Sequence, residues 1–329
     1  MRNRMLVHMS ENEFNYSVAI RTLGTAGTKY QSLLDSLMLQ TVLPQNIFVY
    51  IAEGYPIPKE TVGIEQYIYV KKGMVAQRAL PYDEIDSEYI LFLDDDVYLP
   101  PESVELMYKQ LQENNADVIS PDVFPNAQRS LASSLMMTIS GRMRARRNDD
   151  IWGYKVMRTA GYSYNARPVK DVYWSQTNAG PCFLCLKSTM LNIHFEEELW
   201  LDNLSYAQGD DQVMFYKMYI NGYKQLTTYS SGILHLDAGG NRNPEKEKML
   251  IYSDFRFKTI FWHRYIYSAH NNVMDKFWDC LSIIYAFTFA VLISVLKFRF
   301  DILKLKCSAI RDGIRFIKSE EYKSLHKVI

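Results

Sequence analysis

Three consecutive aspartates, Asp94-Asp95-Asp96, follow an uninterrupted apolar run at residues 89–93. Such a run predicts a strand that is buried on both faces. Three carboxylates at the end of this strand repel one another unless a cation neutralises them. Oxygen ligands favour Mg²⁺ or Mn²⁺, which commonly takes its remaining ligands from substrate phosphates. We therefore predict a metal and diphosphate site here. The alternative is a solvated acidic turn before a helix that begins near Pro101, which needs no metal.

The first half of the chain alternates apolar runs with segments of helical periodicity. Besides 89–93, strands are predicted at residues 16–20, 47–51, 67–70 and 117–120. Helices are predicted after Thr28 as N-cap, at 75–80 and at 101–113. This alternation predicts an α/β fold with a mostly parallel sheet and helices on both faces, whose ligands gather at the carboxyl ends of the strands. The three aspartates lie at such an end.

The second half begins with a segment, residues 124–173, whose periodicity is weak, and we expect a partly mobile loop there. It carries four clustered arginines, which could hold a phosphorylated substrate, contact anionic lipid or form a solvated face: Arg142, Arg144, Arg146 and Arg147. After it, a strand is predicted at 182–186, a helix at 210–221 and a strand at 232–236.

The C-terminal region changes composition from about residue 254, and residues 280–296 form an uncharged apolar stretch. As a helix it would span roughly 25 Å, slightly less than a bilayer core, so spanning the membrane and lying flat on it are both open. The third interpretation is a buried helix that packs on the catalytic domain or on a partner subunit. Residues 297–329 hold nine Lys or Arg against four Asp or Glu, which favours the cytoplasmic face of a membrane.

Composition excludes several other classes of protein. Lys plus Arg equals Asp plus Glu, 37 of each, so no overall field attracts nucleic acid, and we expect no nucleic-acid partner. Cys182 and Cys185 form one CxxC pair without a second pair or a nearby His, which favours packing over zinc binding and suggests a reducing compartment. The N-terminal residues 1–15 are polar and unlike a signal peptide, so export is not expected.

Residues 14–240 resemble a family 2 glycosyltransferase of the GT-A fold. Arg21-Thr22 follows the first strand where that family carries a donor-binding segment, Gly73 to Arg78 is similar to the segment under the nucleotide diphosphate, and Asp94-Asp95-Asp96 falls on the DXD motif. The resemblance implies that Asp96 ligates the metal, that Asp94 contacts the ribose or the metal shell, and that Arg78 is the basic position. Glu53 would replace the aspartate that often reads the base.

Three further segments extend the resemblance. Gly209-Asp210-Asp211-Gln212 resembles the family's Glu-Asp motif, which implies that Asp211, beside Asp210, is the general base. The alternative is that Asp210 is the N-cap of a helix and Asp211 a favourable charge in its first turn, with no catalytic role. His235 matches the position of a third metal ligand, although a structural histidine is the alternative. Asn178-Ala179-Gly180 resembles the turn that lines the donor sugar and acceptor pocket.

We therefore predict a GT-A glycosyltransferase domain at 14–253, with a nucleotide-sugar half at 14–122 and an acceptor half at 123–253, followed by a helical membrane-associated tail at 254–329. The resemblance implies Mn²⁺- or Mg²⁺-dependent, inverting transfer of a sugar from a nucleotide diphosphate-sugar to a lipid-linked saccharide at the cytoplasmic face of the cell membrane. The tail is similar to tails of bacterial enzymes that build surface polysaccharide. The alternatives are a nucleotidyltransferase and a non-catalytic sugar-nucleotide-binding or scaffold protein.

Overall fold

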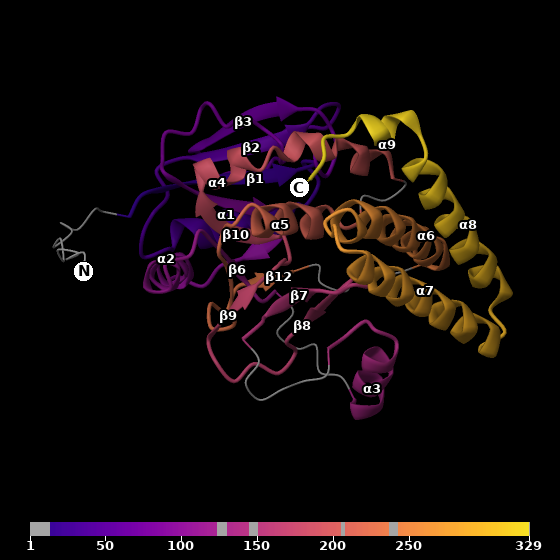
Figure 1. Ribbon diagram of the computed structural model, residues 1–329. Coiled ribbons are helices and arrows are strands. Elements are labelled where there is room, and N and C mark those ends of the chain that lie inside the picture. Colours follow the sequence, from indigo (N-terminus) through magenta and orange to yellow (C-terminus); the bar gives the residue numbers. More distant parts are fainter. Residues whose placement is uncertain (1–13, 124–129, 145–150, 205–207, 237–242, 329) are drawn as a thin grey trace.

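The computed structural model describes residues 14–123, 130–144, 151–204, 208–236 and 243–328. Its centre is an eight-stranded mixed sheet with the spatial order β3-β2-β1-β4-β10-β6-β11-β9 (Figure 1). In chain order, these strands are β1 (Tyr16–Thr22), β2 (Ile47–Ala52), β3 (Glu65–Val70), β4 (Tyr89–Asp94), β6 (Val118–Pro121), β9 (Val172–Ser175), β10 (Cys182–Leu186) and β11 (Gln225–Thr228). The predicted α/β class and the strands of the first half are confirmed.

The pairing is parallel in the first half of the sheet and mixed in the second. Strands β3, β2, β1 and β4 are parallel neighbours, whereas β10 runs antiparallel to both β4 and β6. Strand β11 is parallel to β6 and antiparallel to β9. Two small ladders lie outside the sheet, namely β5 (Val97–Tyr98) with β12 (Leu234–His235), and β7 (Tyr154–Val156) with β8 (Tyr162–Tyr164).

Helices cover both faces of the sheet, because alternate residues of the buried strands point to opposite sides. In β1, Val18 and Ile20 belong to one buried cluster, with α1 (Thr28–Met38) and α2 (Ser103–Glu113), whereas Ala19 belongs to the other. The second cluster contains residues of α4 (Lys187–Asn192), of the 3₁₀ segment η1 (Phe195–Asn203) and of α5 (Asp210–Ile220). The two hydrophobic cores are therefore separated by the sheet itself.

The C-terminal helices α6 (Pro244–Phe261), α7 (Val273–Leu296) and α8 (Phe300–Ile317) form a layer on the side of the molecule opposite to α2 (Figure 1). The π-helical η2 (Trp262–Tyr267) follows α6, and α9 (Glu320–Ser324) follows α8. Helix α6 packs along α8 and adds Phe257, Ile260 and Phe261 to the second core. It also continues through the predicted domain boundary at 253/254, and that division stays a prediction.

Several local predictions were wrong. The segment 75–80 forms hydrogen-bonded turns instead of a helix, with the Arg78 and Ala79 N–H groups both donating to the Val75 carbonyl. Helix α1 begins at Thr28 itself, after Gly27, and has no side-chain cap. The expected strand at 232–236 is only the two-residue β12.

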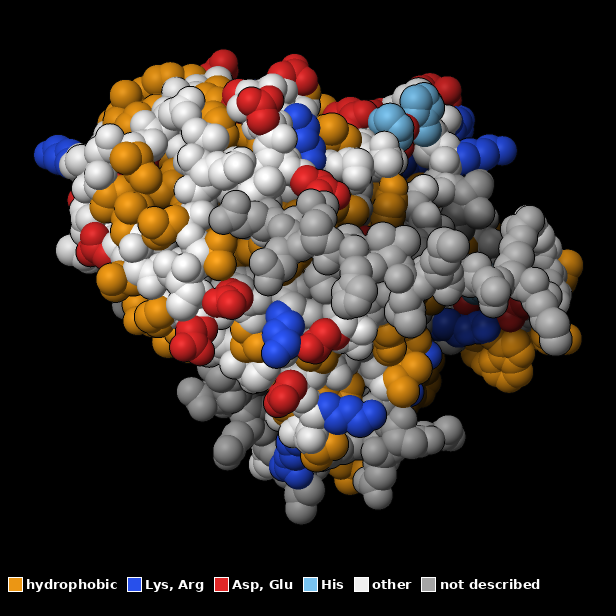
Figure 2. Space-filling model, turned by 90° about the vertical axis from the view of Figure 1, so that its left-hand side faces the viewer, with side chains coloured by type: hydrophobic (Ala, Val, Ile, Leu, Met, Phe, Trp, Pro, Cys, Tyr) orange, Lys and Arg blue, Asp and Glu red, His pale blue; other side chains and the backbone are white. Residues whose placement is uncertain are grey.

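The segment predicted as a loop also contains regular structure. Within 124–173 the structure has α3 (Leu131–Ile139), the β7–β8 hairpin and the start of β9. Residues 124–129 and 145–150, including Arg146 and Arg147, lie outside the described residues. On the face drawn in Figure 2, Lys and Arg side chains are interspersed with Asp and Glu side chains, in agreement with the balanced net charge.

Candidate functional site

The end of β1 and the end of β4 carry the first part of the site. The parallel register places Arg21 opposite Asp94. Arg21 Nε donates to Asp94 Oδ1 at 2.5 Å, and Arg21 Nη2 donates to Asp94 Oδ2 at 3.1 Å. This bidentate geometry fixes both side chains. The next residues pair in the same way, because the Thr22 hydroxyl donates to the Asp95 carboxylate.

Arg78 adds a second guanidinium from the turn after β3. Its Nη2 donates to Asp94 Oδ1 at 3.2 Å and to the Gly180 carbonyl at 2.5 Å, and its Nη1 donates to Asp211 Oδ1. Only 3% of the Arg78 side chain is exposed. These contacts join β4, the 178–180 turn and the start of α5. Arg78 therefore holds the candidate base in place.

The start of α5 brings two more carboxylates to the same point. Gly209 precedes the helix with φ +97°, and a Cβ there would lie 2.3 Å from the Phe257 ring, so only glycine fits. Asp211 Oδ2 accepts from the Gly180 N–H at 3.0 Å. A Cβ on Gly180 would lie 1.9 Å from Asp211 Oδ1, so this close approach also requires glycine. Asp210 Oδ2 lies 3.4 Å from Arg21 Nη1 and 3.6 Å from Arg78 Nη1.

The electrostatics of these carboxylates differ. Burial alone would raise the pKa of Asp94, but the charges of Arg21 and Arg78 hold it below its ordinary value. Burial, reinforced by the negative charge of Asp211, raises the pKa of Asp210 to about 6 despite the two arginines. Burial also raises the pKa of Asp95 to about 6. The site therefore holds carboxylates that ionise reluctantly next to one that is fully ionised at neutral pH.

Asp96 and His235 form a separate pair beside this group. The β5–β12 ladder pairs Val97 with His235, and His235 Nε2 lies 3.1 Å from Asp96 Oδ1. Two adjacent ligands of an octahedral ion at about 2.1 Å lie about 3 Å apart, so this pair fits two positions on a hard cation. Among the described residues, no group of three His, Cys, Asp or Glu side chains can hold a metal alone. A metal here would therefore need ligands from substrate or water.

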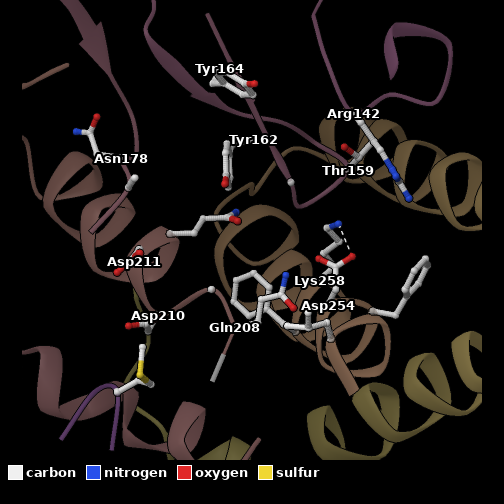
Figure 3. A pocket seen from close by; sticks show the side chains of 18 of the residues that line it. Arg142, Thr159, Tyr162, Tyr164, Asn178, Gln208, Asp210, Asp211, Asp254 and Lys258 are labelled. Carbon is white, nitrogen blue, oxygen red and sulfur yellow. Dashed lines mark hydrogen bonds and ion pairs between the residues drawn. The ribbon is translucent and has the colours of Figure 1, made fainter. Parts of the chain in front are cut away.

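A cavity of about 640 Å³ extends from this group toward the C-terminal helices. Arg21, Asp94, Asp210, Asp211 and His235 line one part of it, together with Asn178 and Ala179. Figure 3 shows Asn178, Asp210 and Asp211 on one side, and Arg142, Asp254 and Lys258 on the other. Tyr162 and Tyr164 of β8 point into the space between them. Its volume would accommodate a ligand of substantial size.

Most of the predicted site residues are thus brought together, and one is not. Glu53 lies at the carboxyl end of β2 and is exposed, and it does not line this cavity. Asn178 is buried, accepts from the Thr227 hydroxyl at 2.5 Å and reaches the cavity wall. Ala179 and Gly180 continue the same turn.

Sequence reasoning missed two kinds of residue. Asp202 accepts from the N–H groups of Val75 and Ala76, at 3.0 Å each, and so supports the turn that carries Arg78. Lys258 and the α7 residues Ala286, Phe287 and Ala290 line the far part of the cavity. Neither set belongs to a local motif, and only the helical period of α7 could have indicated an inward face.

Comparisons with known proteins agree with this arrangement. Residues 68–170 match the family model described as glycosyl transferase family 2. No curated protein matches the chain. One similar solved structure is the crystal structure of GalNAc-T7 with UDP, GalNAc and Mn²⁺, with 14% sequence identity and a TM-score of 0.51. The likeness covers 79% of this chain and 51% of that chain, so this chain spans about half the length of that protein.

At this identity the structural likeness concerns the fold. It confirms the predicted GT-A arrangement, in which a large, mostly parallel sheet is flanked by helices. The family match falls on the segment that includes Arg78, Asp94, Asp95 and Asp96. The chain therefore has the GT-A fold, and its residues 68–170 match glycosyl transferase family 2.

Proposed function

We propose that the protein transfers a sugar from a nucleotide diphosphate-sugar to a lipid-linked saccharide, with inversion at the anomeric carbon, in cell-surface polysaccharide synthesis. The observation that carries the proposal is the position of Asp211. It lies on the cavity wall, oriented by the Gly180 N–H and by Arg78, at the carboxyl ends of the strands where the three aspartates also lie. The match to glycosyl transferase family 2 and the UDP in the similar structure support a nucleotide-sugar donor.

Asp211 is the proposed general base. Its side chain is 31% exposed, so an acceptor hydroxyl in the cavity can reach the carboxylate. The hydroxyl proton passes to Asp211 while the hydroxyl oxygen attacks the anomeric carbon. The bond from that carbon to the diphosphate oxygen breaks, and its electron pair leaves with the diphosphate. Asp210 acts as a buried neighbour that keeps negative charge close to Asp211.

Asp96 and His235 are the proposed metal ligands, and Asp94 is a further candidate. The 3.1 Å separation of Asp96 and His235 and their partial exposure support this assignment. Asp94 is already engaged by Arg21 and Arg78, which favours a role in fixing those arginines. Mn²⁺ or Mg²⁺, when bound, would neutralise charge on the leaving diphosphate. The Mn²⁺ in the similar structure supports a divalent cation.

The remaining predicted residues receive roles by position. Thr22 and Asp95 form a hydrogen-bonded pair beside Arg21 at the strand ends, and we assign all three to the donor. Asn178, Ala179 and Gly180 line or adjoin the cavity beside Asp211 and are assigned to the sugar and acceptor pocket. Glu53 follows β2 outside the cavity, and its assignment to the base of the nucleotide is supported by the sequence resemblance, not by its position in the cavity.

One long apolar helix supports membrane association and, with it, a lipid-linked acceptor. Helix α7 has 24 residues, a mean hydropathy of 2.1 over its most apolar part, and is the one helix among the described residues long and apolar enough to cross a membrane. The excess of Lys and Arg after residue 296 supports the cytoplasmic face. The tail 254–329 is therefore proposed as the membrane-associated part.

A donor screen tests the proposal. Purified protein is incubated with a panel of nucleotide diphosphate-sugars and Mn²⁺ or Mg²⁺, and release of nucleotide diphosphate is measured with and without a lipid-linked acceptor. We expect release from one donor, abolished by EDTA and by Asp96→Ala. Asp83→Ala, at an exposed position outside the cavity, is the matched control and should keep wild-type activity.

The outcomes separate the rival functions. Release of inorganic diphosphate from a nucleoside triphosphate and a sugar phosphate would indicate a nucleotidyltransferase. Donor binding without turnover, with and without lipid-linked acceptor, would indicate a non-catalytic protein. Full activity of Asp96→Ala in the presence of EDTA would overturn the metal assignment.

A further inference from the structure

Helix α7 buries two polar side chains and exposes many large apolar ones. Its buried residues include Asp279 and Ser294 as well as Ile283 and Ala290. Most of its exposed residues are large and apolar, and we call the following, with those of α3 below, the apolar face: Phe277, Trp278, Leu281, Ile284, Leu292 and Leu296. A helix at a water-exposed protein surface has the opposite arrangement. The outer side of α7 is therefore suited to an apolar environment.

The apolar face continues onto α3. The Tyr285 hydroxyl of α7 donates to the Ile139 carbonyl at the end of α3 at 2.5 Å, so the two helices are in contact. Leu135, Met136 and Ile139 of α3 are 61%, 45% and 44% exposed. Figure 1 shows α3 and α7 on the same side of the sheet. A contiguous exposed apolar patch that extends over two helices is typical of an interaction surface.

Helix α7 is held to the rest of the protein along its whole length. Near its start, Arg158 contacts Asp275 at 3.0 Å and Asp279 at 3.3 Å. Near its end, Lys306 Nζ of α8 donates to the Ala290 carbonyl and to Ser294 Oγ, at 2.8 Å each. One side of the helix is thus attached from the first turn to the last.

These attachments are incompatible with α7 crossing a bilayer. If α7 crossed the bilayer, the residues attached to it would enter the hydrocarbon with it. These are Arg158 at one end of α7 and the charged helix α8, which packs against α6 and α7, at the other. Helix α8 carries Asp301, Lys304, Lys306, Arg311, Asp312 and Arg315. Each such charge at the bilayer centre costs about 2.5–3.5 kcal/mol or more. An orientation in the membrane plane avoids this cost, because only the apolar face leaves water.

Basic residues border the apolar face. Lys297 and Arg299 follow α7 and are exposed, and Phe298 and Phe300 between and after them are 80% and 52% exposed. Arg142, also exposed, lies near the end of α3 and lines the cavity. Interspersed cations and exposed aromatics match the boundary between anionic headgroups and acyl chains. Charge complementarity thus favours a lipid surface over a second copy of the chain.

The inner side of the same helix is a wall of the cavity. Ala286, Phe287 and Ala290 of α7 line it, and so do Met137 of α3 and Arg142 (Figure 3 labels Arg142). One helix therefore separates the cavity from the apolar face. A ligand with a lipid tail could keep its tail in the leaflet while its polar part entered the cavity past Arg142.

We propose that α7 and α3 insert their apolar face into one leaflet of an anionic bilayer, parallel to the membrane plane, and so place the cavity at the lipid surface. The delivery of a lipid-linked acceptor rests on the proposed function, whereas the lipid contact does not. Binding to vesicles without any substrate can therefore fail or succeed independently of the glycosyltransferase assay.

The first test is flotation of the full-length protein with vesicles of phosphatidylcholine, with and without phosphatidylglycerol. We expect binding that increases with phosphatidylglycerol and decreases with salt. Leu281→Gln/Ile284→Gln should lower the bound-to-free ratio about tenfold or more. The matched control, Leu39→Gln/Leu43→Gln, changes leucines that are 66% and 54% exposed beside α1 and should leave binding unchanged. Equal loss in both double variants would overturn the proposal.

The second test distinguishes an in-plane helix from a spanning one. Cys307 in α8 is exposed, Cys182 and Cys185 are buried, and the half-buried Cys280 is replaced by Ala. Lys59→Cys, combined with Cys280→Ala and Cys307→Ala, reports on the catalytic domain at an exposed position. An impermeant maleimide is applied to inverted membrane vesicles and to spheroplasts. Labelling of both positions from the same side supports the in-plane orientation, and labelling from opposite sides overturns it.

A third test examines whether a second copy of the chain, instead of lipid, covers the apolar face. Light scattering is measured on the lipid-free protein in dilute solution. A stable dimer that Leu281→Gln/Ile284→Gln dissociates, together with absent vesicle binding, would show that a second copy covers the apolar face and would overturn the proposal. Vesicle binding that the same variant abolishes would support it.

Discussion

Two clusters of charged side chains among the described residues differ in their balance of charge and in their access to a cavity. The sheet-edge cluster consists of Arg21, Arg78, Asp94, Asp210 and Asp211. The helix-side cluster consists of Glu197, Glu198, Lys217 and Arg264. The first has two cations for three carboxylates and lines a cavity, whereas the second has two of each.

The pKa values of the two clusters follow this difference. Burial alone would raise the pKa of Glu198, but hydrogen bonds and charge from Arg264 and Lys217 lower it below its ordinary value. Burial and Asp211 raise the pKa of Asp210 to about 6. The helix-side cluster therefore stabilises the fold in its charged form, and the sheet-edge cluster retains a carboxylate that is costly to ionise. Such a cost beside a cavity is typical of functional sites.

The largest expected effect is on activity, from Asp211→Asn. The amide keeps the shape but cannot accept the hydroxyl proton, so turnover should fall by about 10²–10⁴-fold. The thermal midpoint should change little, because the side chain is partly exposed. Glycosyl transfer and thermal unfolding are measured on the same preparation. Near-normal turnover would show that Asp211 is not the general base. The sheet-edge cluster would then have no demonstrated role in catalysis.

The opposite pattern is expected for Arg264→Met in the helix-side cluster. The variant leaves the fully buried Glu198 carboxylate without its 2.6 Å partner, which should cost about 3–5 kcal/mol of folding stability. Because the pKa of Glu198 is lowered, the wild-type contribution is present above its ordinary pKa and is lost as pH falls through the lowered value.

Chemical unfolding of Arg264→Met and the wild type between pH 3 and 8 measures this effect. Lys323→Met, which breaks an exposed pair at the surface, is the control and should cost less than about 1 kcal/mol. If Arg264→Met lost activity at unchanged stability, the distinction between the two clusters would fail.

Asp210→Asn tests the sheet-edge cluster, because the folding stability that Asp210 contributes should depend on pH in the direction opposite to that of Glu198. A raised pKa means that the protonated carboxyl stabilises the fold below its ordinary pKa, and that this contribution is lost as pH rises through about 6. Above that pH, the amide should be more stable than the wild type by up to roughly 3 kcal/mol, reduced by the ion pairs it loses with Arg21 and Arg78. The difference should shrink below pH 6, and turnover should fall. A destabilised variant at pH 8 would show that the arginine contacts dominate.

The strands that hold the sheet-edge cluster were predictable because they are buried on both faces. Mostly apolar runs identified β1, β2, β4 and β10, and the acidic residues after β4 and at the start of α5 identified the site. The contacts between these segments were not predictable. The pairing of Arg21 with Asp94 depends on the β1–β4 register, and the contact of Arg78 with Asp211 joins residues far apart in the chain.

The far part of the cavity was less accessible to sequence reasoning. Strands β7 and β8 have three residues each, which is too short for a clear period of two. Helix α7 was recognised by its apolar composition, but its start was placed at Cys280 instead of Val273, because Asp275, Lys276 and Asp279 interrupt the apolar run. The packing of Asp279 against His270 and Arg158 removes the charge of Asp279 from solvent, and only the tertiary structure reveals it.

The smallest effect is expected from Asp202→Asn, which tests how firmly the sheet-edge cluster is held. Asp202 contacts the backbone of the turn, at the N–H groups of Val75 and Ala76. An amide oxygen can accept from one of them while its NH₂ group faces the other, a loss of about 1–3 kcal/mol. Because the turn carries Arg78, the donor KM should rise several-fold while kcat changes less. Asp117→Asn is the matched control, since Asp117 also accepts from a backbone N–H, that of Lys224 at 2.7 Å, away from the cavity. It should lower stability without changing KM, and equal KM values in the two variants would reduce Asp202 to a purely structural residue.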